Sequence, residues 1–508
     1  MGAGNFKLEN QLDIQIMSMK PKSCGIYRYI CGPDRLPWVV RKWFALLLSA
    51  HELEFQINQK PMRHAKNIWA LHLYPLFFLF SFATVNAQTA KPDSLLTEAT
   101  LENVIQYALK NQPLIHQSLI DENITEQRIK NALSDWYPQI NAAFNLQHNF
   151  QTPVAVIGGN TIKLGVDNTS SGLFTLRQNL FNPDVIFASK TKGDFRLQAK
   201  QNTTNNRIQI VAEVMKAFYS VLENMQQIQI AEGDITRLER SLKDATNQYQ
   251  AGAADKIDFK RTTISLNNAR ARKSGIEDNL KSRIVYLKLL MNYPAQAQLQ
   301  IIHDTAHLES EVEIGLDTTL LPDYNKRIEY QILETRKKLL QYNIKYNRWA
   351  YLPTLSANAA YNLNYNNNSL SKLYSTNYPN SFAALSLTLP IFQGGKRSTQ
   401  IKQSELELQR TEWDIINLKN TVNAEYADAL ASYKVNYGAY LSLKENLSLA
   451  QEVYDIVQLQ YRSGIKAYIE VITSETDLRN ARILYTTALY NLLTSKVDLL
   501  KSLGSLNY

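Results

Sequence analysis

The sequence of 508 residues has only two cysteines, Cys24 and Cys31, and both lie among its first 61 residues. The rest of the chain can therefore form no disulfide, carries no thiol nucleophile and offers no cysteine ligand to a metal. These absences exclude the disulfide-stapled scaffolds and the thiol enzymes.

Sequence patterns that mark active sites are also missing. There is no G-x-S-x-G motif and no phosphate-binding loop, so Gly158-Gly159 and Gly394-Gly395 are expected to make turns. His303 and His307 have the spacing of a metal-binding pair, but no HExxH motif surrounds them. We therefore expect no enzyme activity, no catalytic residue, no cofactor and no metal site.

Residues 62–87 have the pattern of a secretory signal peptide. A basic start precedes a mostly apolar stretch from Ile68 to Val85, and Val85-Asn86-Ala87 is a small-residue cleavage site. A membrane anchor is the alternative, but Pro75 and the small residues at the end favour cleavage. Residues 1–61 precede the methionine of this signal, so we interpret them as a mis-assigned N-terminal extension.

We predict that the mature chain begins at Gln88. N-terminal sequencing of the exported protein should give this residue or a near neighbour, and a mature protein that retains residues 1–61 would contradict the prediction. Because residue 88 is not cysteine, no lipid is expected on the new N-terminus.

Removal of the leader also lowers the net charge. The first 87 residues hold 10 of the 55 Lys and Arg and 5 of the 46 Asp and Glu, which leaves 45 against 41 and a net charge of +4 instead of +9. Nucleic-acid binding therefore loses its main support, and no nucleic-acid partner is expected.

Two long segments without proline, Asp184–Tyr293 and Ile391–Tyr508, contain a repeated motif. Tyr249-Gln-Ala-Gly252 is followed by Ile257-Asp258, and Tyr461-Arg-Ser-Gly464 lies 212 positions later and is followed by Ile469-Glu470. A lone glycine late in a long helical pattern indicates a C-cap and a chain reversal. The repeat therefore predicts two helical hairpins, 183–292 and 393–504, with their tips at the two glycines.

Ahead of each hairpin the hydrophobic period changes from 3.6 to 2. Alternating residues predict four strands, at 138–150, 172–181, 353–365 and 382–392. A soluble sandwich strand also alternates. Three features nevertheless favour a membrane barrel. The strands have about the 9–11 residues that a bilayer-spanning strand needs, aromatic residues lie at their ends, and the chain carries an export signal. Four strands cannot close a barrel alone, so other copies of the chain must complete it.

The remaining segments complete two similar halves, 88–321 and 322–508. A helix is expected from Leu101 to Ser134 and another from Tyr324 to Trp349, with a mixed connector at 294–321. In the second hairpin, apolar and aromatic residues at spacings of three or four predict packing against neighbouring helices: Val422, Tyr426, Ala429, Tyr433, Tyr437 and Tyr440.

Each half of the chain contains, in order, a strand, a loop, a second strand, a long helix, a Y-x-x-G tip and a return helix. This arrangement resembles the TolC-type outer-membrane efflux proteins over residues 97–508. The resemblance implies an α+β membrane protein of the outer membrane, a homotrimer with a 12-stranded β-barrel and a periplasmic helical barrel. It also implies a periplasmic adaptor, an inner-membrane transporter and contact with outer-membrane lipid. The implied function is the exit duct of a tripartite efflux or type I secretion system. The alternative is a structural or adhesive outer-membrane trimer without transport, which would need no matched glycine tips.

By the same resemblance, the tips that face the adaptor carry Tyr249, Gly252, Tyr461 and Gly464. The positions that match the periplasmic gate are Asp258, Tyr461, Lys466, Glu470 and Thr473. Tyr461 and Asp258 match a tyrosine–aspartate link between the hairpins, and Lys466 matches an arginine that helps to lock the closed state. Two departures are Thr473, in place of a second pore aspartate, and Ile257, in place of a hydrogen-bonding residue.

The spacing of Lys466, Glu470, Thr473 and Asp477 places them on one helical face. A solvated helix face without a gating role is the alternative interpretation.

Overall fold

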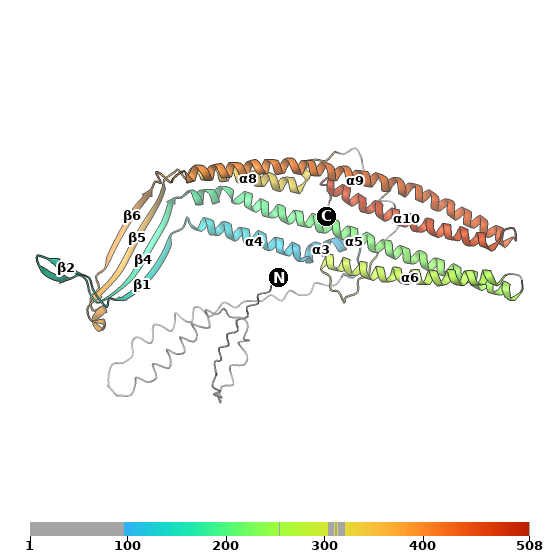
Figure 1. Cartoon of the computed structure of the whole chain (residues 1–508), viewed down its shortest axis with the longest axis horizontal. Coiled ribbons are helices and arrows are strands. Elements are labelled where there is room, and N and C mark those ends of the chain that lie inside the picture. The colour runs from blue at the N-terminus through green and yellow to red at the C-terminus, as the bar shows by residue number, and fades with distance from the viewer. Residues whose placement is uncertain (1–95, 253–254, 303–308, 310–311, 313–320, 507–508) are drawn as a thin grey trace, which may run out of the picture. The chain divides into compact units, whose positions relative to one another are not determined.

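The computed structural model describes residues 96–252, 255–302, 309, 312 and 321–506. The predicted extension and signal peptide, and the histidine pair His303 and His307, lie outside these residues. Within the unit Asp93–Tyr508, the strands gather at one end of the long helices and the two hairpin tips lie at the other end (Figure 1).

The helix expected from Leu101 to Ser134 is in fact two helices, α3 (Leu101–Asn111) and α4 (Pro113–Ser134). Proline at position 113 cannot donate a helical hydrogen bond and pushes the preceding residue out of the helical region. Gln112 accordingly has an extended backbone with ψ of 124°. The prediction of one continuous helix was wrong because Pro113 acts as the first residue of a new helix.

Four antiparallel strands form one sheet in the order β1-β4-β5-β6. Their bounds are β1 Gln139–His148, β4 Asn168–Phe181, β5 Thr354–Asn367 and β6 Asn380–Thr388. The strand predicted at 172–181 therefore begins earlier, and the one predicted at 382–392 ends before Pro390, which has no N–H for the ladder.

The register sorts the side chains of this sheet by polarity. Ile140 pairs with Leu176, which pairs with Ala359, so one face is apolar. Asn141 pairs with Thr175, which pairs with Ala360, and most other residues on this second face are polar. The apolar face is largely uncovered in a single chain: Phe144 is 76% exposed and Leu385 is 72% exposed.

The segment between β1 and β4 contains a second small sheet. β2 (Val154–Ile157) pairs with β3 (Asn160–Lys163). Gly158 and Gly159 between them have φ of 60° and 84°, as a two-residue hairpin turn of the primed type requires. The prediction of turns at this glycine pair was right, but the hairpin around it was missed. The second loop, after β5, holds a short 3₁₀ helix, η2 (Leu370–Ser375).

Each half continues into a long helical hairpin. In the first, α5 (Pro183–Gln250) is followed by α6 (Lys256–Met291). In the second, α9 (Lys396–Arg462) is followed by α10 (Tyr468–Ser502). Asn182 caps α5, since its side chain accepts a hydrogen bond from the backbone of Asp184. At 1.5 Å per residue, the 68 residues of α5 span about 100 Å.

The main hydrophobic core lies between α5 and α10, with residues of α3, α6 and α9. Of the second-hairpin residues predicted to pack, Tyr433 and Tyr440 are buried in this core, and Tyr426, Ala429 and Tyr437 pack against it. Ahead of α9, the short helix η1 (Tyr324–Lys326) and α8 (Ile328–Trp349) run beside the second hairpin.

Among the described residues, every helix is too polar or too short to cross a lipid bilayer.

Candidate functional site

The two hairpin tips are built alike. At the end of α9, the N–H of Gly464 donates to the carbonyl of Tyr461 (2.9 Å) and the N–H of Ile465 donates to that of Gln460 (2.9 Å). These two bonds define a Schellman motif, with Gly464 at the left-handed position. At the end of α5, the N–H of Gly252 likewise donates to the carbonyl of Tyr249 (3.1 Å). The φ angles of Gly252 and Gly464 are 69° and 73°, so both positions require glycine.

Aromatic side chains brace each reversal. The Tyr249 ring stacks on Phe259 at the start of α6, with 6.5 Å between ring centroids. The Tyr461 ring packs against Tyr468, the first residue of α10, at 5.6 Å. The motif tyrosines therefore support the turns from within their own hairpins.

One tip residue also connects the two hairpins, though not through the expected partner. The Tyr461 hydroxyl donates to Oε1 of Gln248 on α5 at 3.3 Å. In the described part of the chain, the Asp258 carboxylate receives no hydrogen bond, so the tyrosine–aspartate link does not form within one chain. The end of α9 meets the end of α5, whereas Asp258 lies beyond the turn, at the start of α6.

A second polar link at this level was not expected from the sequence. The Tyr468 hydroxyl lies 3.0 Å from Oγ1 of Thr262, which joins α10 to α6. Burial raises the pKa of Tyr468, so its hydroxyl stays protonated and available as a hydrogen-bond donor.

The other positions predicted to form the gate lie just before α10 and in its first turns, where they form a charged pair and a polar edge. Lys466 is paired with Glu470 at 2.5 Å, and both side chains are partly exposed, 38% and 42%. Such an exposed pair contributes little to stability, about 0–1 kcal/mol. Thr473 and Asp477 are exposed, as a face turned to water requires. Lys466, which precedes α10, is thus engaged with the first turn of that helix rather than with the first hairpin.

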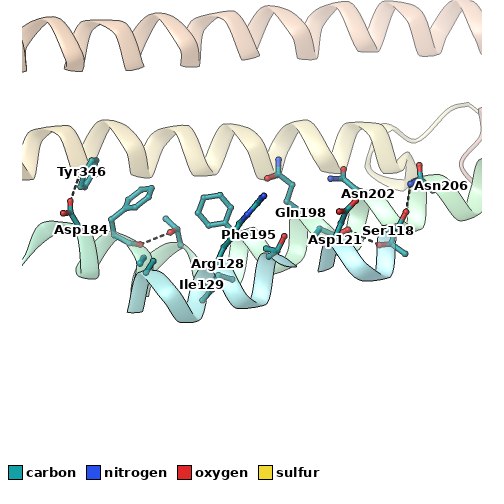
Figure 2. Close-up of a pocket in the computed structure, with 17 residues that line it drawn as sticks. Ser118, Asp121, Arg128, Ile129, Asp184, Phe195, Gln198, Asn202, Asn206 and Tyr346 are labelled. Atoms are coloured by element: carbon teal, nitrogen blue, oxygen red, sulfur yellow. Dashed lines mark hydrogen bonds between the residues drawn. The ribbon is translucent and has the colours of Figure 1, made fainter. Parts of the chain in front are cut away.

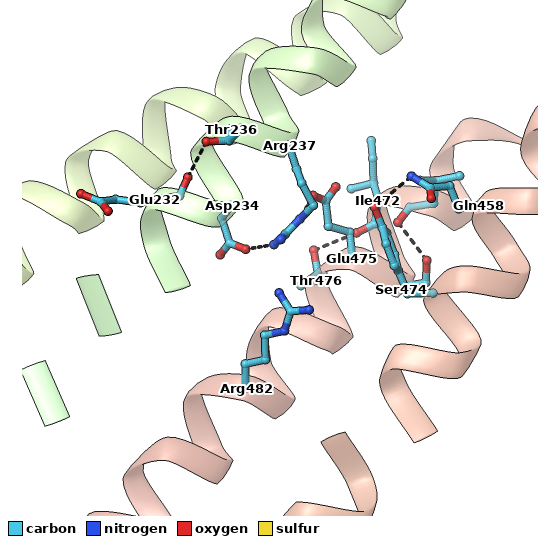
Figure 3. A network of polar contacts seen from close by, with 12 residues as sticks. Glu232, Asp234, Thr236, Arg237, Gln458, Ile472, Ser474, Glu475, Thr476 and Arg482 are labelled. Atoms are coloured by element: carbon cyan, nitrogen blue, oxygen red, sulfur yellow. Dashed lines mark hydrogen bonds and ion pairs between the residues drawn. The ribbon is translucent and has the colours of Figure 1, made fainter. Parts of the chain in front are cut away.

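Farther from the tip, a cluster of charges is buried between the hairpins (Figure 3). Arg237 of α5 forms ion pairs with Asp234 and with Glu475 of α10, the latter at 3.1 Å between Nε and Oε1. Asp234 is 4% exposed and Glu475 is 7% exposed. Burial raises the pKa of both carboxyls, although neighbouring arginines oppose this rise.

The sequence offered a weak signal for this cluster, namely charged residues inside an otherwise mixed helical pattern. Arg237 and Glu475 are 238 positions apart, and their pairing depends on which faces of α5 and α10 meet.

Near the strands, a groove of about 650 Å³ follows α4 and α5 (Figure 2). Its apolar lining includes Ile129 and Phe195. Several of its polar groups bond to one another. The Tyr346 hydroxyl donates to Asp184 at 2.6 Å, and Asn206 donates to Ser118 at 2.7 Å. Burial and this carboxylate raise the pKa of Tyr346 to about 12. The groove thus lies between α4, α5 and Tyr346 of α8, far from the tips.

Comparison with protein-family models gives one match, to "Outer membrane efflux protein", over residues 104–292 and 331–505. The two matched segments contain both hairpin tips, and together they cover most of the chain.

Individual relatives are distant but similar over most of their length. The outer membrane protein TolC of Escherichia coli is 22% identical over 82% of this chain and 84% of its own. OprJ of Pseudomonas aeruginosa is 22% identical over 85% of this chain and 90% of its own. Among solved structures, VceC of Vibrio cholerae superposes with a TM-score of 0.62 at 13% identity, over 80% of this chain and 96% of its own.

Proposed function

The chain belongs to the outer membrane efflux protein family, and from this premise we propose that it is the exit duct of a tripartite efflux or type I secretion system. It is a channel protein of the cell outer membrane, with its helical part in the periplasm. In the proposed system it passively conducts substrates that an inner-membrane transporter and a periplasmic adaptor deliver to it.

The observation that carries the proposal is the separation of two surfaces along one chain. At one end, four strands present an uncovered apolar face that includes Ile140, Phe144 and Leu385, which are 72%, 76% and 72% exposed. A continuous apolar face of this kind is suited to lipid. At the other end, two matched glycine turns offer a surface to a partner.

The open sheet edges support the proposed trimer. β1 and β6 end the sheet, and each has one side without a partner strand in the described chain. Unpaired backbone groups cannot face hydrocarbon, so β1 of one copy is proposed to pair with β6 of the next. Three copies of four strands then close a 12-stranded barrel, and the long helices continue it as a helical barrel through the periplasm.

The direct test is electrical. Purified full-length protein in planar lipid bilayers is expected to produce discrete conductance steps. When the protein is isolated from cell envelopes after crosslinking, an adaptor and a transporter are expected to be attached to it. If the purified protein gives no conductance, even in the tip variant Tyr461→Phe with Lys466→Ser, the protein is not a duct.

The loops Gln151–Ser171 and Asn366–Ser381 are predicted to face the outside of the cell. They join strands whose other ends continue into the periplasmic helices, so they must lie on the opposite side of the membrane. Peptide tags inserted at Gly158 and at Asn377 should be labelled on intact cells, while a tag at Gly252 should be labelled after outer-membrane permeabilisation. Labelling of all three tags only after permeabilisation would refute this topology.

A further inference from the structure

The contact between α5 and α10 changes character along its length. Away from the tips, both helices contribute buried apolar residues to the main core: Val214, Phe218 and Leu222 from α5, and Leu489, Leu493 and Val497 from α10. An ion pair between the two helices at this level, Lys216 with Asp498, is partly exposed. Nearer the tips, the described contacts between these two helices include the ion pair of Arg237 with Glu475. The apolar cluster at this level, Leu238 with Leu266 and Ala269, instead joins α5 to α6 of the same hairpin.

The charges around the two buried carboxylates are not balanced. Two carboxylates, Asp234 and Glu475, face arginines from three helices: Arg237 of α5, Arg272 of α6, and Arg479 and Arg482 of α10. Nε of Arg479 is buried and has no hydrogen-bond partner among the described residues. The two carboxylates therefore hold mutually repelling arginines together across the hairpin interface.

A buried ion pair is a contact of a particular kind. Desolvation offsets most of its Coulombic gain, so the intact pair adds little net stability. Removing one member, however, leaves an uncompensated charge in a largely desolvated site. Such a contact can separate when both members become hydrated together, and it is disrupted when either member is removed alone.

We propose that Arg237 and Glu475, supported by Asp234, form a second latch that holds the two hairpins together behind the tip gate. The apolar contact farther from the tips stays closed and acts as the fixed part about which the tip halves move. When the duct opens, the latch separates and its charges become hydrated. This inference rests on the proposed function, since it requires a duct with closed and open states.

The test measures single-channel conductance of purified full-length protein in planar bilayers. In Glu475→Gln, Arg237 keeps Asp234 of its own helix but loses its ion pair to α10, and it then faces Arg479 and Arg482 across the interface. We therefore expect the hairpins to separate and conductance to rise at least twofold. Adding Arg237→Gln removes the stranded cation, so the double variant should conduct less than Glu475→Gln alone.

A matched control is available on the same helix. Glu239 of α5 pairs with Arg270 at 2.8 Å, but this pair lies within the first hairpin and is exposed. Glu239→Gln should therefore leave conductance unchanged. A rise equal to that of Glu475→Gln would overturn the latch, because any lost ion pair would then suffice.

A crosslink covers the case in which Glu475→Gln does not assemble. The sequence has no cysteine after Cys31, so Arg237→Cys with Glu475→Cys can be bridged by a short bis-maleimide. The bridged protein should stay at low conductance even when the tip variant Tyr461→Phe with Lys466→Ser is added. Full opening of the bridged protein would overturn the latch alone, whereas no conductance in any form would overturn the proposed duct and the latch with it.

Discussion

The Gly464→Val variant is expected to form trimers of normal stability and to export nothing. Gly464 has a φ of 73°, and an added Cβ would meet no atom within 4 Å, so the cost is in the backbone and not in a steric clash with neighbours. Left-handed geometry costs an ordinary L-residue about 1 kcal/mol, and a β-branched residue more. The valine is therefore expected to break the hydrogen bonds from Gly464 and Ile465 to the end of α9.

Trimers should survive because the turn lies far from the strands and from the main core. Export should fail because the reshaped turn no longer fits the adaptor. Both are measured in cells that lack the native gene, as trimer bands on unheated gels and as export of the transported substrate, together with recovery of the adaptor from crosslinked envelopes.

Two other glycine variants control for this result. Gly438 lies within α9, is exposed and has open space around its Cβ position, so Gly438→Val should export normally. Gly464→Asn should keep partial export, because asparagine tolerates the left-handed region better than other residues. Normal export by Gly464→Val would place the adaptor contact away from the tips.

The sequence was most informative where local chemistry decides the structure. Gly252 and Gly464 could be predicted as turns because only glycine accepts their φ angles at no steric cost. The strands could be predicted because apolar and polar residues alternate along them. A shift of one residue would move every apolar side chain to the opposite face of the sheet, so the alternation from Ile140 to His148 also sets the register. The β2–β3 hairpin carried a weaker signal, the apolar run Val154–Ile157 directly before Gly158-Gly159, but the second strand, Asn160–Lys163, is mostly polar and obscured it.

Contacts between distant segments could not be predicted in this way. The partner of Tyr461 depends on the exact depth at which α9 meets α5, and a shift of one turn would replace Gln248 with another residue. The cluster of Asp234, Arg237 and Glu475 likewise depends on the rotation of two long helices about their axes. Helices of this length have apolar residues on more than one side, so their pattern does not select one rotation.

The proposed gate at the hairpin tips leads to the prediction with the second large effect. Tyr461→Phe removes the hydroxyl that binds Gln248, and Lys466→Ser removes the cation paired with Glu470. The first change frees the end of α9 from α5, and the second loosens the start of α10. The combined variant is therefore expected to raise single-channel conductance severalfold in planar bilayers.

Lys466 and Glu470 also predict the ion selectivity of the channel. Three copies of Glu470 around a narrow entrance would concentrate negative charge and favour cations, while each Lys466 partly neutralises it. Lys466→Ser alone should therefore increase cation selectivity, and Glu470→Gln should decrease it and weaken block by divalent ions. These opposite signs separate a charged ring at the pore from a solvated helix face, for which neither variant would change selectivity.

Tyr454→Phe is the matched control for the loss of the Tyr461 hydroxyl. Tyr454 lies on the same helix, and its hydroxyl accepts a hydrogen bond from Gln458 of that helix at 3.1 Å, so its loss cuts no link between hairpins. This variant should conduct like the native protein. If Tyr454→Phe and the combined tip variant conduct equally, the constriction does not lie at Tyr461 and Lys466. If only the combined variant opens, the hydrogen bond from α9 to α5 is part of what keeps the entrance shut.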